Sequence, residues 1–165
     1  ENILQAETLT VNQPENLCLV TQTTLSVSDT EEIVLKLKEK FPMLQEPKSE
    51  DICYATQNRQ DAVKQLALES DLILVVGSEN SSNSTRLKEL AENCGVKSFL
   101  VDDPEKISSI NLEGVKIMGI TAGASAPEEL VQQMVSKCST LGYKVNQEIS
   151  GLKEEVFFKL PAELR

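Results

Sequence analysis

The chain has 165 residues and carries 16 lysines and arginines against 26 aspartates and glutamates, for a formal net charge of −10. A surface this acidic repels phosphate backbones, which argues against general nucleic-acid binding. The sequence contains no histidine, and this excludes Ser-His catalysis, Cys-His catalysis and histidine-ligated zinc within these residues.

The amino-terminal part of the sequence predicts the end of one small α/β unit. The apolar run at residues 17–20 indicates a strand, and a shorter strand is expected around residues 9–11. A helix is predicted over about residues 29–41. Residues 41–51 contain two prolines and several charges, which is typical of a linker. We therefore assign residues 1–46 to this unit.

Residues 47–141 alternate between helical and extended patterns, which predicts a second, complete α/β domain. Strands that alternate with helices favour a mostly parallel sheet flanked by helices. Residues 142–165 follow as a tail, with a possible strand at residues 156–160. The elements predicted within the domain are a helix at 58–69, a strand at 72–76, a helix at 85–93, strands at 98–101 and 115–120, and a helix at 128–141.

The four cysteines are widely spaced, and none forms a Cys-x-x-Cys pair, so neither a zinc ribbon nor a thioredoxin motif is present. We interpret Cys18, Cys94 and Cys138 as reduced thiols that pack as small hydrophobic side chains. Cys53 differs from them because it directly precedes a helix, where backbone N–H groups favour a thiolate.

Three loops that follow predicted strands are rich in small hydroxyl and amide side chains. In parallel sheets, ligands bind beyond the carboxyl ends of the strands, where these loops are expected. Residues 80–84, Asn-Ser-Ser-Asn-Ser, suit a phosphate or diphosphate bound by backbone N–H groups and hydroxyls at a helix start. Ordinary N-capping is the alternative, both here and for Ser125. Thr23, taken alone, is typical of a structural turn at a strand end.

These loops together resemble those of the hydroxymethylbutenyl diphosphate reductases, the LytB (IspH) family. The resemblance implies three related α/β domains around a central cavity, of which this chain would hold the carboxyl-terminal portion. It also implies an oxidoreductase of non-mevalonate isoprenoid biosynthesis. Such an enzyme reductively removes a hydroxyl from an allylic diphosphate to give isopentenyl and dimethylallyl diphosphate. The segments that carry the resemblance are residues 20–30, 51–60, 75–87 and 119–128, and the closing run 158–165.

The resemblance also implies a 4Fe-4S cluster, held by three cysteines, that receives electrons from ferredoxin or flavodoxin. Cys53 matches one cluster ligand, and Thr23 matches a catalytic threonine beside the substrate hydroxyl. The family's other two cluster cysteines, its histidines and its proton-donating glutamate are missing here. We therefore expect this chain alone to be inactive. The residues that match the diphosphate cradle are Ser81, Ser82, Asn83 and Ser125.

Further expectations concern the surroundings of this site. We expect the four cradle residues to converge on one anion site and the loop that carries Asn83 to be exposed. A cytoplasmic location, or the plastid stroma in a eukaryote, is expected, with neither a membrane nor a nucleic acid as partner. A non-catalytic phosphate- or diphosphate-binding α/β module is the first alternative. A flavodoxin-like partner-binding domain without a ligand is the second.

Overall fold

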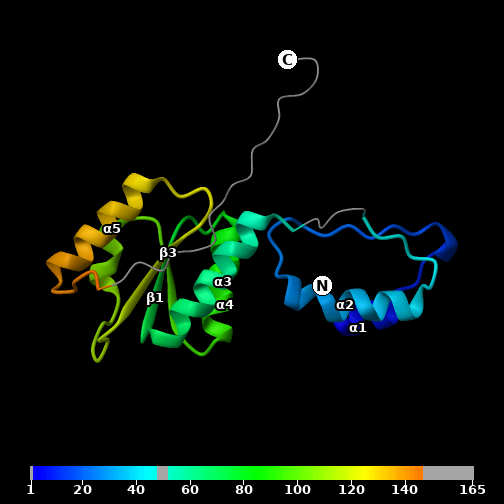
Figure 1. The fold of residues 1–165 in the computed structure, drawn as a ribbon, viewed down its shortest axis with the longest axis horizontal. Helices are drawn as coiled ribbons and strands as arrows, with labels where there is room; N and C mark the ends of the chain where they lie inside the picture. The colour runs from blue at the N-terminus through cyan, green and yellow to red at the C-terminus, as the bar shows by residue number, and fades with distance from the viewer. Residues whose placement is uncertain (1, 48–51, 147–165) are drawn as a thin grey trace, which may run out of the picture.

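Three parallel strands form the centre of the carboxyl-terminal part of the molecule, which the computed structural model describes over residues 2–47 and 52–146. Strand β1 (Leu72–Val76) lies between β2 (Lys97–Val101) and β3 (Met118–Ala122). Strands β1 and β3 are labelled in Figure 1. It pairs in parallel with both neighbours along its whole length. The predicted α/β fold with a parallel sheet flanked by helices is therefore confirmed.

The sheet is covered on both faces. Every residue of β1 is buried, and successive side chains point to opposite faces of the sheet. One face packs against α3 (Tyr54–Glu69) and α4 (Ser82–Asn93). The other face packs against α5 (Glu128–Thr140) and the 3-10 helix η2 (Pro104–Ser109). The result is a three-layer domain with two hydrophobic cores.

Three helices begin at the same edge of this sheet. Helices α4 and α5 follow β1 and β3, so their first turns lie at the carboxyl ends of the strands. Helix α3 precedes β1 and is joined to it only by Ser70 and Asp71. It therefore runs antiparallel to the strand and also begins at the carboxyl edge (Figure 1). Unpaired N–H groups at helix starts give this edge a partial positive charge.

The amino-terminal part, described over residues 2–47, contains helices but neither of the two strands predicted there. Helix α1 (Ile3–Thr8) packs along α2 (Val27–Lys40), and a short 3-10 helix, η1 (Pro14–Asn16), lies between them in sequence. The strand predicted at residues 17–20 is wrong, because only an isolated bridge joins Cys18 to Gln45. An extended apolar run forms a ladder only beside a partner strand, and none is present among the described residues.

Several element boundaries differ from those predicted. The shorter strand expected at residues 9–11 is also absent there. Helix α3 begins four residues earlier than predicted. Helix α4 begins three residues earlier, because its first turn consists of short polar residues that resemble a loop in sequence. Strand β3 begins at Met118 rather than at 115. The possible strand at 156–160 lies outside the described residues. Within the described ranges, no helix is both long and apolar enough to cross a membrane.

Candidate functional site

The loop between β1 and α4 uses one serine as a helix cap. Ser81 is the N-cap of α4, and its hydroxyl oxygen accepts a hydrogen bond from the backbone N–H of Ser84 at 3.3 Å. The backbone N–H of Ser81 donates to the carbonyl of Ser78 at 2.9 Å. Ordinary capping therefore explains Ser81 and leaves Ser82, which is exposed, and Asn83 without such a role.

Asn83 is buried, with only 7% of its surface exposed, so the expectation that its loop is exposed is wrong for this residue. Neither its side-chain nitrogen nor its side-chain oxygen has a hydrogen-bond partner in the described part of the chain. Buried polar groups are nearly always paired, and an unpaired one costs about 1–3 kcal/mol. The first turn of α4 thus holds a buried amide that lacks a partner among the described residues.

The loop between β3 and α5 adjoins the loop between β1 and α4. A Cβ atom placed on Gly123 would lie 2.0 Å from the hydroxyl oxygen of Ser84, and one placed on Gly77 would lie 2.3 Å from it. Gly123 also donates its N–H to the carbonyl of Val76 at 2.9 Å. Ser125, which is exposed, therefore lies on a loop that packs against the helix start carrying Ser81 and Asn83.

This edge of the sheet has the topology of a ligand-binding crevice. Strands β2 and β3 lie on opposite sides of β1, while α4 and α5 cover opposite faces. Ligands of open α/β sheets bind where the connections diverge in this way. Residues 77–84 and 123–127 contain neither lysine nor arginine. Any anion bound there would be held by hydroxyls, amides and helix N–H groups rather than by cationic side chains.

Cys53 and Thr23 are brought together at the start of α3. Cys53 is the exposed N-cap residue of this helix, and its backbone N–H donates to the carbonyl of Thr23 at 3.1 Å. A second contact joins the same segments, because the side-chain amide of Gln60 donates to the carbonyl of Leu25 at 3.3 Å. The exposed Thr23 therefore lies beside a cysteine 30 positions further along the chain.

The other cysteines do not gather around Cys53. Cys18 and Cys94 are exposed, and none of the four cysteines forms a disulfide. Cys138 is buried beside the sulfur of Met118 at 3.5 Å, and this burial raises the pKa of its thiol. In residues 2–47 and 52–146, no three cysteine, histidine or acidic side chains lie close enough to hold a metal ion. A 4Fe-4S cluster needs more thiolates than Cys53 supplies.

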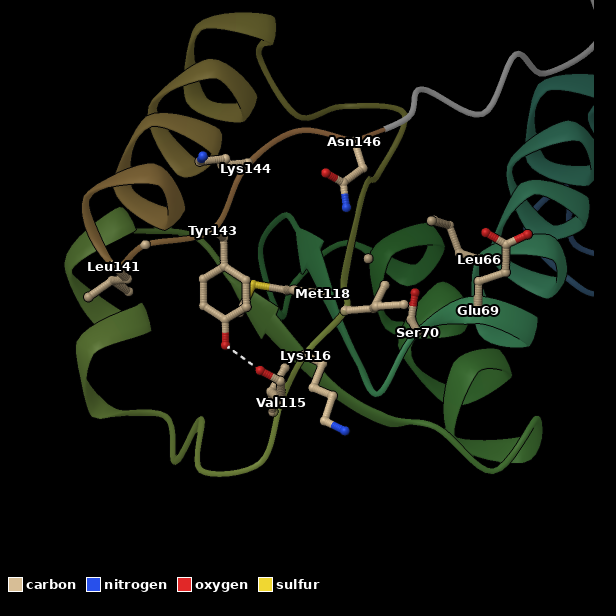
Figure 2. A pocket seen from close by; sticks show the side chains of 13 residues that line it. Leu66, Glu69, Ser70, Val115, Lys116, Met118, Leu141, Tyr143, Lys144 and Asn146 are labelled. Carbon is tan, nitrogen blue, oxygen red and sulfur yellow. Dashed lines mark hydrogen bonds between the residues drawn. The ribbon is translucent and has the colours of Figure 1, made fainter.

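A cavity of about 750 Å³ lies at the opposite, amino-terminal end of β3 (Figure 2). Tyr143 lines it and donates its hydroxyl to the carbonyl of Val115 at 3.0 Å. Nearby, the Asp71 carboxylate accepts the N–H groups of Ile117 and Lys116, which together hold its pKa below the ordinary value. Tyr143 and Asp71 are thus both paired with backbone groups, unlike the amide of Asn83. No motif in the sequence predicted this cavity.

Comparison with known proteins assigns the family. The family described as "LytB protein" matches residues 2–139. The chain belongs to the LytB family. It is 54% identical over 157 residues to the 4-hydroxy-3-methylbut-2-enyl diphosphate reductase of Alcanivorax borkumensis, covering 95% of this chain and 50% of that protein. With the Haemophilus influenzae reductase, this LytB chain shares 53% identity over 165 residues, covering 100% and 52%. It thus spans about half the length of these curated relatives.

Solved structures of LytB proteins support the fold. The reductase structure from Plasmodium falciparum superimposes with a TM-score of 0.74 at 38% identity, covering 82% of this chain and 43% of that one. A second structure, titled as the terminal enzyme of the non-mevalonate pathway, gives a TM-score of 0.52 at 30% identity, covering 74% and 43%. Both identities are high enough for the likeness to extend beyond the α/β architecture to the family.

Proposed function

We propose that this LytB chain is the carboxyl-terminal part of a 4-hydroxy-3-methylbut-2-enyl diphosphate reductase. The enzyme would reductively remove the allylic hydroxyl and release isopentenyl and dimethylallyl diphosphate. Family membership supports this proposal, and the observation that carries it is the buried, unpaired amide of Asn83 at the carboxyl edge of the sheet. We further propose residues 1–46 as the end of a middle domain, 47–141 as a third domain and 142–165 as a tail.

The diphosphate would be held by a cradle of neutral donors. Backbone N–H groups at the starts of α4 and α5 contribute their partial positive charge, each helix end worth about 0.3–1 kcal/mol for an anion. The side-chain amide of Asn83 would gain the partner that it lacks within residues 2–47 and 52–146. The side chains proposed to contact the diphosphate are Ser81, Ser82, Asn83 and Ser125.

Thr23 and Cys53 would act at the other end of the substrate. An iron–sulfur cluster of the 4Fe-4S type, when bound, would supply the electrons for the reduction, drawn from ferredoxin or flavodoxin. Cys53 would be one thiolate ligand, favoured by the N–H groups at the start of α3. The hydroxyl of Thr23 would orient the leaving hydroxyl and help to move a proton to it. Two further cysteines would come from residues beyond this sequence.

A reducing compartment, the cytoplasm of a bacterium, suits this proposal because the four cysteines are unpaired. A second candidate function, a diphosphate-binding module without catalysis, is favoured by one observation. The described residues contain no group of side chains that could hold a metal ion. The two functions differ in what Cys53 does in the full-length protein.

The deciding experiment compares two exposed cysteines in the full-length reductase after anaerobic reconstitution. Cys53→Ser should lose the visible absorption and the iron of the cluster, whereas Cys94→Ser should retain four irons per chain. The 165-residue chain alone should be colourless and without stoichiometric iron. A stable four-iron cluster on that chain would refute the assignment of Cys53 as the lone ligand here.

A second variant tests the role of Thr23. Thr23→Val keeps the shape of the side chain and removes its hydroxyl. In the full-length enzyme it should lower kcat while leaving the absorption spectrum of the cluster unchanged. Full turnover by this variant would remove Thr23 from the mechanism without touching the cysteine assignment.

A further inference from the structure

Ser84 occupies an unusual position for a residue in the first turn of a helix. It is the third residue of α4, and its side chain is 0% exposed. Serine in a first turn normally faces water or caps the helix. Here the hydroxyl lies instead between the carboxyl ends of the two neighbouring strands β1 and β3, beside Gly77 and Gly123.

The approach of the two glycines to Ser84 leaves no room for a side chain on either. A Cβ on Gly123 would lie 2.0 Å from the Ser84 hydroxyl oxygen and 3.2 Å from its Cβ. A Cβ on Gly77 would lie 2.3 Å from the same oxygen. The Ser84 side chain thus packs against the backbone of both loops, and its size sets the distance between the two loops.

Both donor groups of Ser84, its backbone N–H and its hydroxyl, are bonded to the hydroxyl oxygen of Ser81. The backbone N–H of Ser84 donates to the Ser81 hydroxyl oxygen at 3.3 Å, and the Ser84 hydroxyl donates to the same oxygen at 3.0 Å. A serine hydroxyl has two acceptor lone pairs and one proton to donate. With both lone pairs taken from the helix side, Ser81 is left with its proton free for an acceptor outside α4.

We propose that Ser84 is a positioning residue for the diphosphate cradle. Its buried hydroxyl makes Ser81 a hydrogen-bond donor toward the ligand. This inference rests on the proposed function, because the acceptor that Ser81 would meet is a diphosphate oxygen. Ser84 itself is too deeply buried to touch that ligand.

The test is a double-mutant cycle in the full-length reductase, with the Kd for inorganic pyrophosphate measured by calorimetry. Ser84→Ala should weaken binding about 10-fold, the size of one hydrogen bond to a charged group. It should raise KM for the allylic diphosphate and leave kcat nearly unchanged, because uniform binding is lost. In a Ser81→Ala background, the same substitution should cost less than about 2-fold, since Ser84 acts through Ser81.

Two further variants separate positioning from folding. Ser98→Ala is the matched control, because Ser98 is also buried and donates a single hydrogen bond, to the carbonyl of Ile73 at 3.2 Å in the sheet. It should alter stability without altering the Kd. Ser84→Cys keeps a weak donor and should recover part of the affinity lost in Ser84→Ala, which also covers the case in which Ser84→Ala folds poorly.

The outcomes distinguish this inference from the proposed function. The positioning role is overturned if Ser84→Ala leaves the Kd unchanged, or if it weakens binding equally in the wild-type and Ser81→Ala backgrounds. In either case, the proposed function still stands as long as the wild-type enzyme binds pyrophosphate. Failure of the wild-type enzyme to bind either pyrophosphate or the allylic diphosphate overturns both.

Discussion

Polar side chains at the two ends of the central sheet differ in their partners. At the amino-terminal end, the exposed Asp71 carboxylate accepts two backbone N–H groups and the half-buried Tyr143 donates to a backbone carbonyl, so each of these two groups has a partner. At the carboxyl end, the amide of Asn83 is buried and has no partner among the described residues. The amino end nevertheless has the cavity of about 750 Å³.

This contrast shows that volume alone does not locate the site in this domain. A hydroxyl that already has a backbone partner, as Tyr143 does in the cavity, offers little to a ligand, whereas a buried amide without a partner gains a hydrogen bond when a ligand arrives. We therefore expect substitutions at the amino end to change stability only. Substitutions at the carboxyl end should change ligand binding. The predictions below test this division, starting with the largest effect.

Gly123→Ala should have the largest effect, and it should lower both the stability of the fold and the affinity for the ligand. The new Cβ would lie 2.0 Å from the Ser84 hydroxyl oxygen, so the two loops must separate. We expect unfolding to become easier by about 1–3 kcal/mol, as for other overpacked sites, and pyrophosphate binding to weaken more than about 10-fold.

The matched control for Gly123→Ala is Gly119→Ala, a substitution at the amino end of the same strand. Its Cβ would meet the Ser70 hydroxyl oxygen at 2.7 Å, and this side chain can rotate. Chemical denaturation should show a smaller loss of stability, and calorimetry should show an unchanged Kd. Weakened ligand binding in Gly119→Ala would break the division between the two ends.

Asn83→Leu should weaken diphosphate binding about 10-fold without lowering stability. The substitution removes a donor and an acceptor that have no partner among the described residues, so no hydrogen bond within that part of the chain is lost. Titration with inorganic pyrophosphate, alongside a thermal melt, separates the two effects. A marked loss of stability with intact binding would show that Asn83 has a structural partner after all.

Asp71→Asn should lower the melting temperature at neutral pH and leave ligand binding alone. Hydrogen bonds from Ile117 and then Lys116 hold the pKa of Asp71 below its ordinary value of 3.8. A carboxylate whose pKa is lowered by folding stabilises the fold at pH values above its ordinary, unfolded-state pKa. This stabilisation is lost as the pH falls through the lower pKa of the folded state. The melting temperatures of the variant and the wild type should therefore converge below about pH 4. A constant difference at all pH values would contradict this.

Tyr143→Phe should have the smallest effect. It removes the hydroxyl that donates to the Val115 carbonyl and leaves the ring in place. The expected loss of stability is about 1 kcal/mol, with no change in the Kd for pyrophosphate. A change in ligand affinity here would assign the cavity of Figure 2 a role in binding.

The central domain could be predicted well from sequence because its signals are local. The apolar run at Leu72–Val76 matches β1 residue for residue, since a strand buried on both faces is continuously hydrophobic. The acidic residues Glu128 and Glu129 mark the start of α5 as predicted. The two strands predicted in the amino-terminal part were wrong because a strand forms only beside a partner strand, and a local sequence pattern does not show whether such a partner is present.

The candidate site was predicted in composition but not in geometry. The run of short polar residues at 80–84 pointed to a helix start with donors, and α4 does begin there. The burial of Asn83 and Ser84 could not be read from it, because burial depends on how the first turn meets two glycines from separate loops. The contact between Cys53 and Thr23 likewise joins distant segments. Convergence of the four cradle residues on one anion stays a prediction.

The absence of lysine and arginine from residues 77–84 and 123–127 has a kinetic consequence. Dipoles act only at short range, while the net charge of −10 acts over a Debye length, about 10 Å at 0.1 M salt. A diphosphate that approached this chain would therefore be repelled before it came within reach of those dipoles. Added salt screens the repulsion and leaves the close contacts intact. Association should consequently speed up as ionic strength rises, the reverse of the behaviour of sites that attract phosphates with cations.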